Sequence, residues 1–273
     1  MMETLRSKSN QALREAIYSG KVIRIPACAR SRNLVARVWA LIEQEFGVST
    51  PRRKLQFKLS GEEFYARIGK VRQRLAGEKA YQTLLFELLA AKGFAKGEHA
   101  VDPARLRAVT HLGHENPKAA PAYTAHRDSW YANPEAQINW WIPLHDVTES
   151  DSFKFFYDRF DKPVLNNSGD FDYDAWMSSV GWQNTSGKAA VYPCVIEDGF
   201  DDEKGAAFKA SAGDMILFSA AHLHQTVKNA SGSTRFSIDF RTVHLADLQK
   251  GKGAVNVDNR SSGCSLKDYL VQI

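Results

Sequence analysis

Apolar residues recur at helical spacing in three segments of the first 100 residues. In residues 33–46 they stand at i, i+4, i+7 and i+8, and Gly47 follows as a stop signal. A second amphipathic segment opens with the capping-box pattern Ser60-Gly-Glu-Glu63, and a third covers residues 79–92. The pattern predicts a layer of amphipathic helices that covers a partner surface, such as a sheet.

From about Leu106 the chain alternates between polar and apolar residues, as a strand does. The further predicted strands are short and rich in aromatic and apolar residues: Gln137–Leu144, Phe153–Tyr157, Ala189–Ile196, Met215–Phe218 and Arg235–Thr242. Short strands at this density predict an antiparallel barrel or sandwich. Residues 158–187 resemble a long loop, which is more often a functional lid or insert than a plain connection.

Helices followed by strands predict an α+β fold with a helical layer, mostly N-terminal, on one face of a β-barrel. We expect one domain over residues 1–273. In it, residues 1–104 are mainly helical support, residues 105–245 form the β core with the insert at about 158–187, and residues 246–273 form a C-terminal tail. The part of this tail from Gly251 to Gly263 is polar and is expected to be mobile.

Composition excludes several classes of protein. The chain has 44% hydrophobic and 25% charged residues, as ordinary globular proteins have. No apolar run reaches the roughly 20 residues of a membrane span, and none follows the charged N-terminus as in a secretory signal. The three cysteines include no close pair, which argues against disulfides and zinc and favours the cytoplasm.

The charge is unevenly distributed. Residues 1–120 hold 22 Lys and Arg against 11 Asp and Glu, whereas the remainder holds 14 against 20. The basic residues are spread through helix-like segments without a dense cluster, so solvated helical faces are the preferred interpretation. We expect neither nucleic acid nor a membrane as partner. A small-molecule substrate that is anionic or carrier-bound stays open, and the sequence leaves the oligomeric state open too.

The candidate chemistry lies in Tyr123-Thr-Ala-His-Arg-Asp-Ser-Trp-Tyr131, just before a predicted strand. In an extended segment, His126 and Asp128 point to the same side. His224 follows an apolar strand 98 residues further on, so only the fold can bring it to this pair. Two histidines and one carboxylate with open positions are the ligand set of non-haem Fe(II) oxygenases.

The strand from Arg235 adds a second signal. With a period of two, Phe236, Ile238 and Phe240 face one way, and the polar residues at 235, 237, 239 and 241 face the other. If the apolar face packs under the helices, Arg235 and Ser237 point into the barrel. A buried arginine is costly without an anion, and a dicarboxylate would neutralise it by a bidentate contact, with a hydrogen bond from Ser237.

At these residues the chain resembles the 2-oxoglutarate/Fe(II)-dependent dioxygenases, and more closely the phytanoyl-CoA dioxygenase branch. The resemblance covers roughly residues 105–245, and Arg235 stands at the family's spacing, 11 residues past His224. The matching elements are His126-Arg-Asp128, Trp141-Ile-Pro-Leu, Gly213-Asp-Met-Ile-Leu-Phe, His224-Gln-Thr226 with Asn229, and Arg235-Phe-Ser237.

The resemblance implies a double-stranded β-helix, that is, a jelly-roll or cupin-like barrel. It implies that His126, Asp128 and His224 ligate Fe(II). It also implies that Arg235 and Ser237 hold the distal carboxylate of 2-oxoglutarate, and that Thr226 and Trp141 line the cofactor site. The implied reaction uses O2 and converts 2-oxoglutarate to succinate and CO2 while a small molecule is hydroxylated. Desaturation and cyclisation share the same ligands, whereas the superfamily's halogenases carry Gly or Ala where Asp128 stands.

The chain departs from the family after the predicted strand that ends at Leu144, where residues 149–162 replace the usual turn and Pro-Gly-Ser-His motif. This region shapes the substrate pocket, so the family does not supply the substrate.

Several alternatives stay open at this point. His222 has the same strand parity as His224 and competes for the metal, although the spacing to Arg235 favours His224. We interpret His111 and His114 as surface or core residues, Arg127 and Arg159 as solvated surface, and Asp239 as a partner of Arg235 or Arg241. The aromatic residues at 130, 131 and 140 are interpreted as core. The competing functions are a cupin-type metalloenzyme that does not use 2-oxoglutarate and a catalytically inactive binding module on the same fold.

Overall fold

The fold is that of a computed structural model, which describes residues 2–4, 9–47, 51–179, 181 and 191–271. Its main sheet has eight strands in the order β1-β2-β8-β5-β10-β3-β11, and β4 also pairs with β10. Only β1 and β2 run parallel to each other. The strands are β1 (Met2–Thr4), β2 (Val22–Ile25), β3 (His99–Val101), β4 (Arg105–Val109), β5 (Gln137–Pro143), β8 (Met215–Ser219), β10 (Arg235–His244) and β11 (Leu270–Val271).

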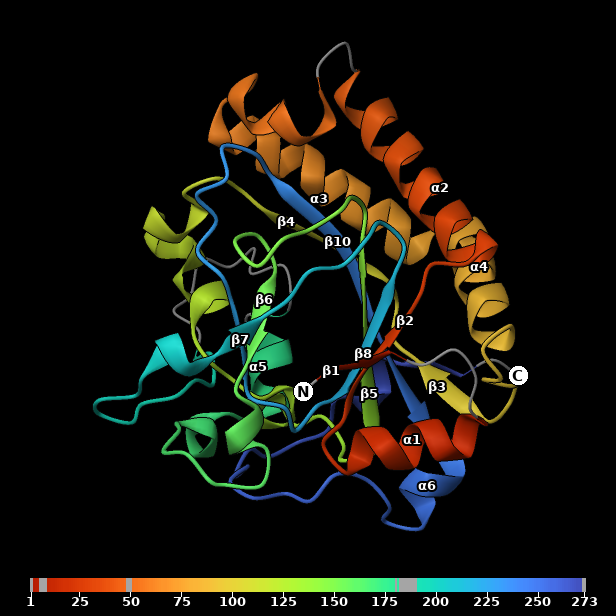
Figure 1. The fold of residues 1–273 in the computed structure, drawn as a ribbon, viewed down its shortest axis with the longest axis vertical. Helices are drawn as coiled ribbons and strands as arrows, with labels where there is room; N and C mark the ends of the chain where they lie inside the picture. The colour runs from red at the N-terminus through yellow and green to blue at the C-terminus, as the bar shows by residue number, and fades with distance from the viewer. Residues whose placement is uncertain (1, 5–8, 48–50, 180, 182–190, 272–273) are drawn as a thin grey trace.

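A second sheet of three strands lies on the opposite side of the main sheet from the long helices (Figure 1). Its order is β7-β6-β9, with β6 (Phe153–Phe155), β7 (Ala206–Ala207) and β9 (His224–Thr226). Aromatic side chains join the two sheets: Phe155 lies 5.0 Å from Phe218, and Phe153 lies 5.2 Å from Trp141, measured between ring centroids. The molecule is therefore a sandwich of two sheets with a helical layer outside it.

Helices cover the outer face of the main sheet (Figure 1). Leu34, Phe64 and Leu88 from the long helices share one buried core with Phe236, Ile238 and other residues of the sheet. The helices are α1 (Asn10–Tyr18), α2 (Ala29–Phe46), α3 (Gly61–Gly77), α4 (Lys79–Ala90), α5 (Tyr173–Ser179) and α6 (Leu245–Gln249). Short 3-10 helices connect them, at Arg52–Phe57, Gly113–Glu115, Pro117–Tyr123, Asp128–Tyr131, Tyr157–Arg159, Ser168–Asp170, Asp202–Lys204 and Ser265–Asp268.

The three predicted helices are confirmed, with shifted ends. Helix α2 ends at Gly47, whose φ of 63° is left-handed, as the stop signal indicates. The Ser60 hydroxyl accepts a hydrogen bond from the Glu63 backbone N–H at 3.1 Å and caps α3. No helix of the described residues is long and apolar enough to cross a membrane.

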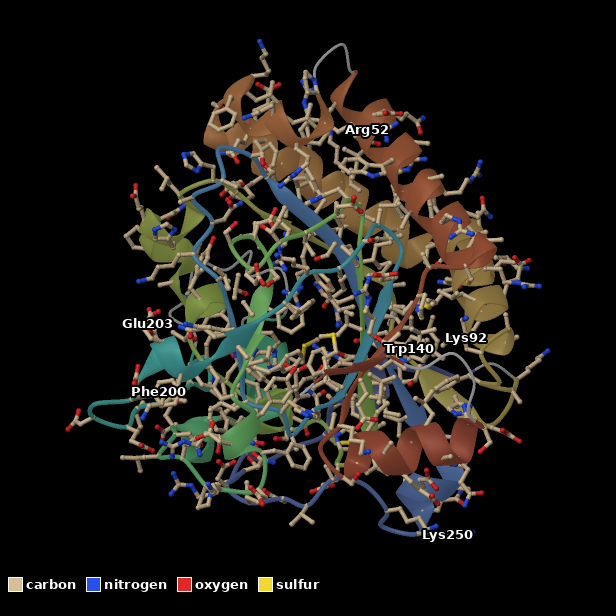
Figure 2. The ribbon with its side chains drawn as sticks, viewed as in Figure 1. Arg52, Lys92, Trp140, Phe200, Glu203 and Lys250 are labelled. Carbon is tan, nitrogen blue, oxygen red and sulfur yellow. The ribbon has the colours of Figure 1, made fainter. Side chains whose placement is uncertain are left out.

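The predicted alternation of the strand from Arg235 is confirmed. Phe236, Ile238 and Phe240 lie in the core under the helices, so Arg235 and Ser237 face the space between the sheets. Trp140, on the neighbouring strand, is fully buried in the interior (Figure 2), while Arg52, Glu203 and Lys250 are exposed at the edge of the molecule.

Two expectations were wrong in part, and a third is extended by three short strands. Residues 191–196 form no strand, only an isolated bridge of Val195 with Asn166, and residues 189–190 lie outside the described chain. The N-terminal part supplies strands β1, β2 and β3 as well as helices, because sequence-distant segments complete the sheet edges. No strand belongs to both sheets, so the described residues do not close a barrel.

The C-terminal tail is packed rather than loose. The Asp258 side chain is 5% exposed and accepts hydrogen bonds from Arg127, Trp130 and the backbone of Val164. Polar composition indicated a mobile segment, but here the polar groups pair with buried groups of the body.

Candidate metal centre

The backbone brings His126 and His224 side by side. The N–H of each donates to the carbonyl of the other at 3.0 Å, and the two ring centroids lie 4.4 Å apart. The first histidine lies in the connection before the 3-10 helix at Asp128, and the second begins β9. The sandwich thus pairs residues that are 98 positions apart in the sequence.

Hydrogen bonds fix the same tautomer in both rings. Nδ1–H of His126 donates to the Thr124 carbonyl at 2.9 Å, and Nδ1–H of His224 donates to the His222 carbonyl at 2.9 Å. Because a carbonyl can only accept, the proton sits on Nδ1 and the lone pair on Nε2. Metal-binding imidazoles are commonly held in this way.

Asp128 completes a three-residue cluster. Its Oδ1 lies 3.7 Å from Nε2 of His126, and one ligand atom from each of the three residues lies within 4.8 Å of the others. Nδ2 of Asn139 donates to the second oxygen, Oδ2, at 2.6 Å. The cluster offers two neutral nitrogens and one carboxylate oxygen, which suits a divalent transition metal.

The electrostatic environment keeps these groups ready to ligate. Burial, assisted by the neighbouring His224, lowers the pKa of His126 to about 4, so this imidazole is neutral at neutral pH. Burial by itself raises the pKa of Asp128, but the neighbouring His224 and Arg241 side chains outweigh this effect, so the pKa lies below its usual value.

The structure separates His222 from the cluster. Its Nε2–H donates to the Gly20 carbonyl at 3.1 Å, and its Nδ1 accepts the Ser219 N–H at 3.2 Å. Both ring nitrogens are therefore used inside the protein, and His224 is the histidine that faces the metal position.

Arg235 and Ser237 are buried without partners. Arg235 is 3% and Ser237 0% exposed, and within the described chain neither Nε nor Nη1 of Arg235 nor Oγ of Ser237 has a hydrogen-bond partner. Burial, with a contribution from Arg107, lowers the pKa of Arg235 to about 10. Buried donors this close together call for an acceptor that the protein itself does not supply.

Trp141 and Thr226 lie between these features. The Arg235 guanidinium lies 5.6 Å from the Trp141 ring centroid, which packs against Phe153, and Phe153 lies 6.0 Å from His224. Thr226 pairs with Phe153 across the small sheet and is half-buried. The predicted site residues therefore gather on facing sides of the two sheets, and their individual roles stay predictions.

Two sequence interpretations of charged residues were wrong. Asp239 pairs with Arg107 by three hydrogen bonds of 2.9 to 3.1 Å, because the register of β4 against β10 places Arg107 opposite Ser237. Arg127 is 1% exposed rather than solvated, and it binds Asp258 and the carbonyls of Ala221, Phe160, Arg159 and Lys162.

The remaining sequence interpretations fit the structure. Arg159 is partly exposed beside Asp158 and Glu197. Nδ1 of His111 accepts the Gly232 N–H, and the His114 ring packs on Tyr123, so both histidines have structural contacts. Arg107 and Asn139 were not identified as site residues from the sequence. Each is a polar residue on the inward face of a core strand, and this placement can be recognised only once the registers of β4 and β5 against β10 are known.

The chain is similar to known proteins only at the level of solved structures with low sequence identity. No protein-family model and no curated protein matches the chain. Among solved structures it is similar to the apo form of the non-heme monooxygenase ThoJ, with 12% identity over 85% of this chain and 77% of that one and a TM-score of 0.46. It is also similar to EvdO2 from Micromonospora carbonacea var. aurantiaca, with 13% identity, coverages of 89% and 94% and a TM-score of 0.47.

A third similar structure is the epimerase SnoN in complex with Fe3+, alpha ketoglutarate and nogalamycin RO. It has 13% identity, coverages of 95% and 98% and a TM-score of 0.42. All three TM-scores are below 0.5, so these similarities do not establish a function.

Proposed function

We propose that the protein is a non-haem Fe(II)- and 2-oxoglutarate-dependent oxygenase that hydroxylates a small molecule. The observation that carries this proposal is the unpartnered pair Arg235–Ser237, buried on the same side of the main sheet that faces His126, Asp128 and His224. A cupin-type metalloenzyme without 2-oxoglutarate would have no use for that pair, and an inactive binding module would need neither the pair nor the triad.

The residues present fit both groups. Two Nε2 lone pairs and one carboxylate oxygen would supply three ligands to Fe(II), which is the donor set of the two-histidine, one-carboxylate triad. One carboxylate of 2-oxoglutarate would accept from Arg235 and Ser237, which removes the cost of burying the guanidinium unpaired. When bound, the metal and 2-oxoglutarate supply oxidation by O2, with succinate and CO2 as co-products.

The chain's own residues hold, orient and shield these groups. Asn139 fixes the carboxylate of Asp128, and the two backbone carbonyls fix the histidine rings. Trp141, Phe153 and Phe218 form an apolar wall beside the centre. Next to apolar groups, each charge–charge contact with the ligands is stronger than in bulk solvent.

We also propose the finer assignments that the motifs favour. The two facing sheets support a double-stranded β-helix, and the presence of Asp128 supports hydroxylation over halogenation. The placement beside the phytanoyl-CoA dioxygenases rests on the sequence motifs alone.

Binding of 2-oxoglutarate under anaerobic conditions tests the proposal. Addition of 2-oxoglutarate to the Fe(II) protein should produce a visible charge-transfer band, and Asp128→Ala should abolish it by removing a ligand. Arg235→Ala should raise the 2-oxoglutarate concentration needed by roughly ten- to a hundredfold, because a charge-assisted contact of about 1.5–3 kcal/mol is lost. Arg159→Ala, at the surface, is the matched control.

Two results would contradict the proposal. The absence of the band in the wild-type protein would move the assignment to a metalloenzyme that does not use 2-oxoglutarate. An unchanged 2-oxoglutarate affinity in Arg235→Ala would show that the cosubstrate binds elsewhere.

We further propose that the substrate carries an anionic group that binds at Arg107. This side chain is 49% exposed although it lies on the inward face of β4, next to Ser237. Asp239 occupies its Nε and Nη2 and leaves Nη1 for a ligand. Its positive charge also acts on both His126 and Asp128, which supports a position near the metal.

Substrate-stimulated succinate release checks this assignment. In a panel of small carboxylates and phosphates with their neutral amide and alcohol counterparts, only the acids should stimulate release. Arg107→Gln should raise the KM of the stimulating acid, and Arg107→Lys, which keeps the positive charge, should raise it less. Lys70→Ala, on the exposed face of α3, should leave this KM unchanged. Stimulation by neutral compounds alone, or a KM indifferent to Arg107, would exclude an anionic substrate at this position.

A further inference from the structure

A chain of three hydrogen bonds, two of them buried and the last partly buried, runs from the C-terminal tail to the candidate metal ligand Asp128. The Tyr269 hydroxyl donates to Oε1 of Gln137 at 2.6 Å, and Nε2 of Gln137 donates to Oδ1 of Asn139 at 2.8 Å. Nδ2 of Asn139 then donates to Oδ2 of Asp128 at 2.6 Å. Gln137, Asn139 and Tyr269 are 0%, 5% and 8% exposed, so water does not compete for these groups.

All three hydrogen bonds point the same way. Tyr269 donates into the first amide, and this fixes which end of Gln137 faces Asn139 and which end of Asn139 faces Asp128. Aligned bonds of this kind polarise one another and strengthen the last one. With Oδ2 engaged, Oδ1 is the oxygen directed at His126, as a ligand that binds through one oxygen requires.

The tail reaches Asp128 by a second route as well. The Ser265 hydroxyl donates to Oδ1 of Asn133 at 2.5 Å, and Nδ2 of Asn133 donates to the Asp128 carbonyl at 2.7 Å. One route therefore holds the side chain of the ligand and the other holds its backbone.

We propose that Tyr269 is a positioning residue of the metal centre, acting on Asp128 through Gln137 and Asn139. The proposal rests on the proposed function only in taking the triad as a metal site. Residues that orient metal ligands from outside typically contribute ten- to a hundredfold to metal affinity. The C-terminal tail supplies none of the three candidate ligands, yet through Tyr269 it influences the affinity of the centre for its metal.

Metal binding by Tyr269→Phe tests the proposal without any assay of turnover. Mn(II) is the probe, and free Mn(II) is followed by electron paramagnetic resonance. We expect roughly tenfold or greater loss of affinity. Tyr173→Phe is the matched control: Tyr173 is fully buried and its hydroxyl donates to Asp268 of the same tail, away from Asp128.

A double-mutant cycle separates the relay from simple tethering of the tail. Gln137→Met interrupts the chain at its second link, so it should lower Mn(II) affinity by itself, and Tyr269→Phe should then have no further effect. The visible spectrum of the Co(II)-loaded protein should change in Tyr269→Phe and Gln137→Met but not in Tyr173→Phe, because it reports ligand geometry. If Tyr269→Phe does not fold, Gln137→Met alone decides the matter.

The failures of the two proposals can be told apart. Wild-type protein that does not bind Mn(II) would remove the metal site and the relay with it. If the wild-type protein binds Mn(II) and either Tyr269→Phe or Gln137→Met binds it with the same affinity, the metal site stands and only the relay is overturned. Equal losses of Mn(II) affinity in Tyr269→Phe and Tyr173→Phe would also overturn the relay, because anchoring of the C-terminal tail would then be enough to explain both losses.

Discussion

Two buried arginines show how a single residue's surroundings separate structure from function. Arg127 meets Asp258 and four backbone carbonyls, so its charge is satisfied within the protein. Arg235 is as deeply buried, yet Nε and Nη1 have no partner in the described residues. Because burying an unpaired charge is costly, Arg127 has a structural role, and Arg235 is the residue that we propose as the receptor for an anion.

His99 gives a prediction at the same scale. Burial lowers its pKa to about 4, and its Nε2 is buried without a partner. The unfolded chain, with a pKa near 6.5, binds the proton more readily, so this residue's contribution to stability is complete above pH ~6.5 and is lost as the pH falls toward 4. Between pH 7.5 and 5 the loss is about 2 kcal/mol.

Urea unfolding of the wild type and of His99→Phe at both pH values measures this contribution. The variant keeps a ring beside Phe94 but cannot take up a proton. It should lose less stability on acidification than the wild type, and the remaining loss belongs to other buried histidines such as His222. Equal losses in the two proteins would contradict the assignment.

At the scale of elements, β10 serves the core and the site at once. It pairs with β5 along one edge and with β4 and β3 along the other, and its alternation sends aromatic residues to the helices and polar ones to the space between the sheets. A shift of the register by one residue would exchange these two faces. Seven residue pairs with β5 specify the register.

Where the tail crosses the start of β5, a glycine is required. A Cβ on Gly253 would lie 2.3 Å from the carbonyl carbon of Glu135. Gly253→Ala should therefore destabilise the protein by about 1–3 kcal/mol, because backbone cannot yield as a flexible side chain can. Gly69→Ala, at an exposed position of α3 with nothing within 4 Å of the added Cβ, should stabilise it by about 0.5–1 kcal/mol.

Free energies of unfolding of the two glycine variants test this contrast. Opposite signs are expected, and equal values would show that the tail can move away from β5 without cost.

At the scale of the whole molecule, the candidate centre joins the two layers of the sandwich. His224 belongs to the small sheet, whereas Asp128 is held by Asn139 of the main sheet. The C-terminal tail contacts the segment around Asp128 through Asp258, which binds Arg127, and Ser265, which binds Asn133. Metal binding would thus link layers that otherwise meet through aromatic packing.

The sequence by itself determined the three long helices α2, α3 and α4, the strands β4, β5, β6, β8 and β10, and the identity of the candidate ligands. Their signals are local: periodicity, caps, and a His-x-Asp pair whose side chains point the same way. The alternation from Arg235 also put this residue and Ser237 on the face of the strand opposite to Phe236, Ile238 and Phe240. These features depend on neighbours within a few positions, which the sequence records directly.

Only the tertiary structure decided the rest. It engaged both ring nitrogens of His222 away from the cluster, paired Asp239 with Arg107, buried Arg127, and placed Tyr269 at the head of a relay to Asp128. Each of these depends on strand register or on contacts between residues about a hundred or more positions apart, which local patterns do not encode. The composition of the polar tail indicated a mobile segment because the partners of its polar groups lie in other parts of the chain.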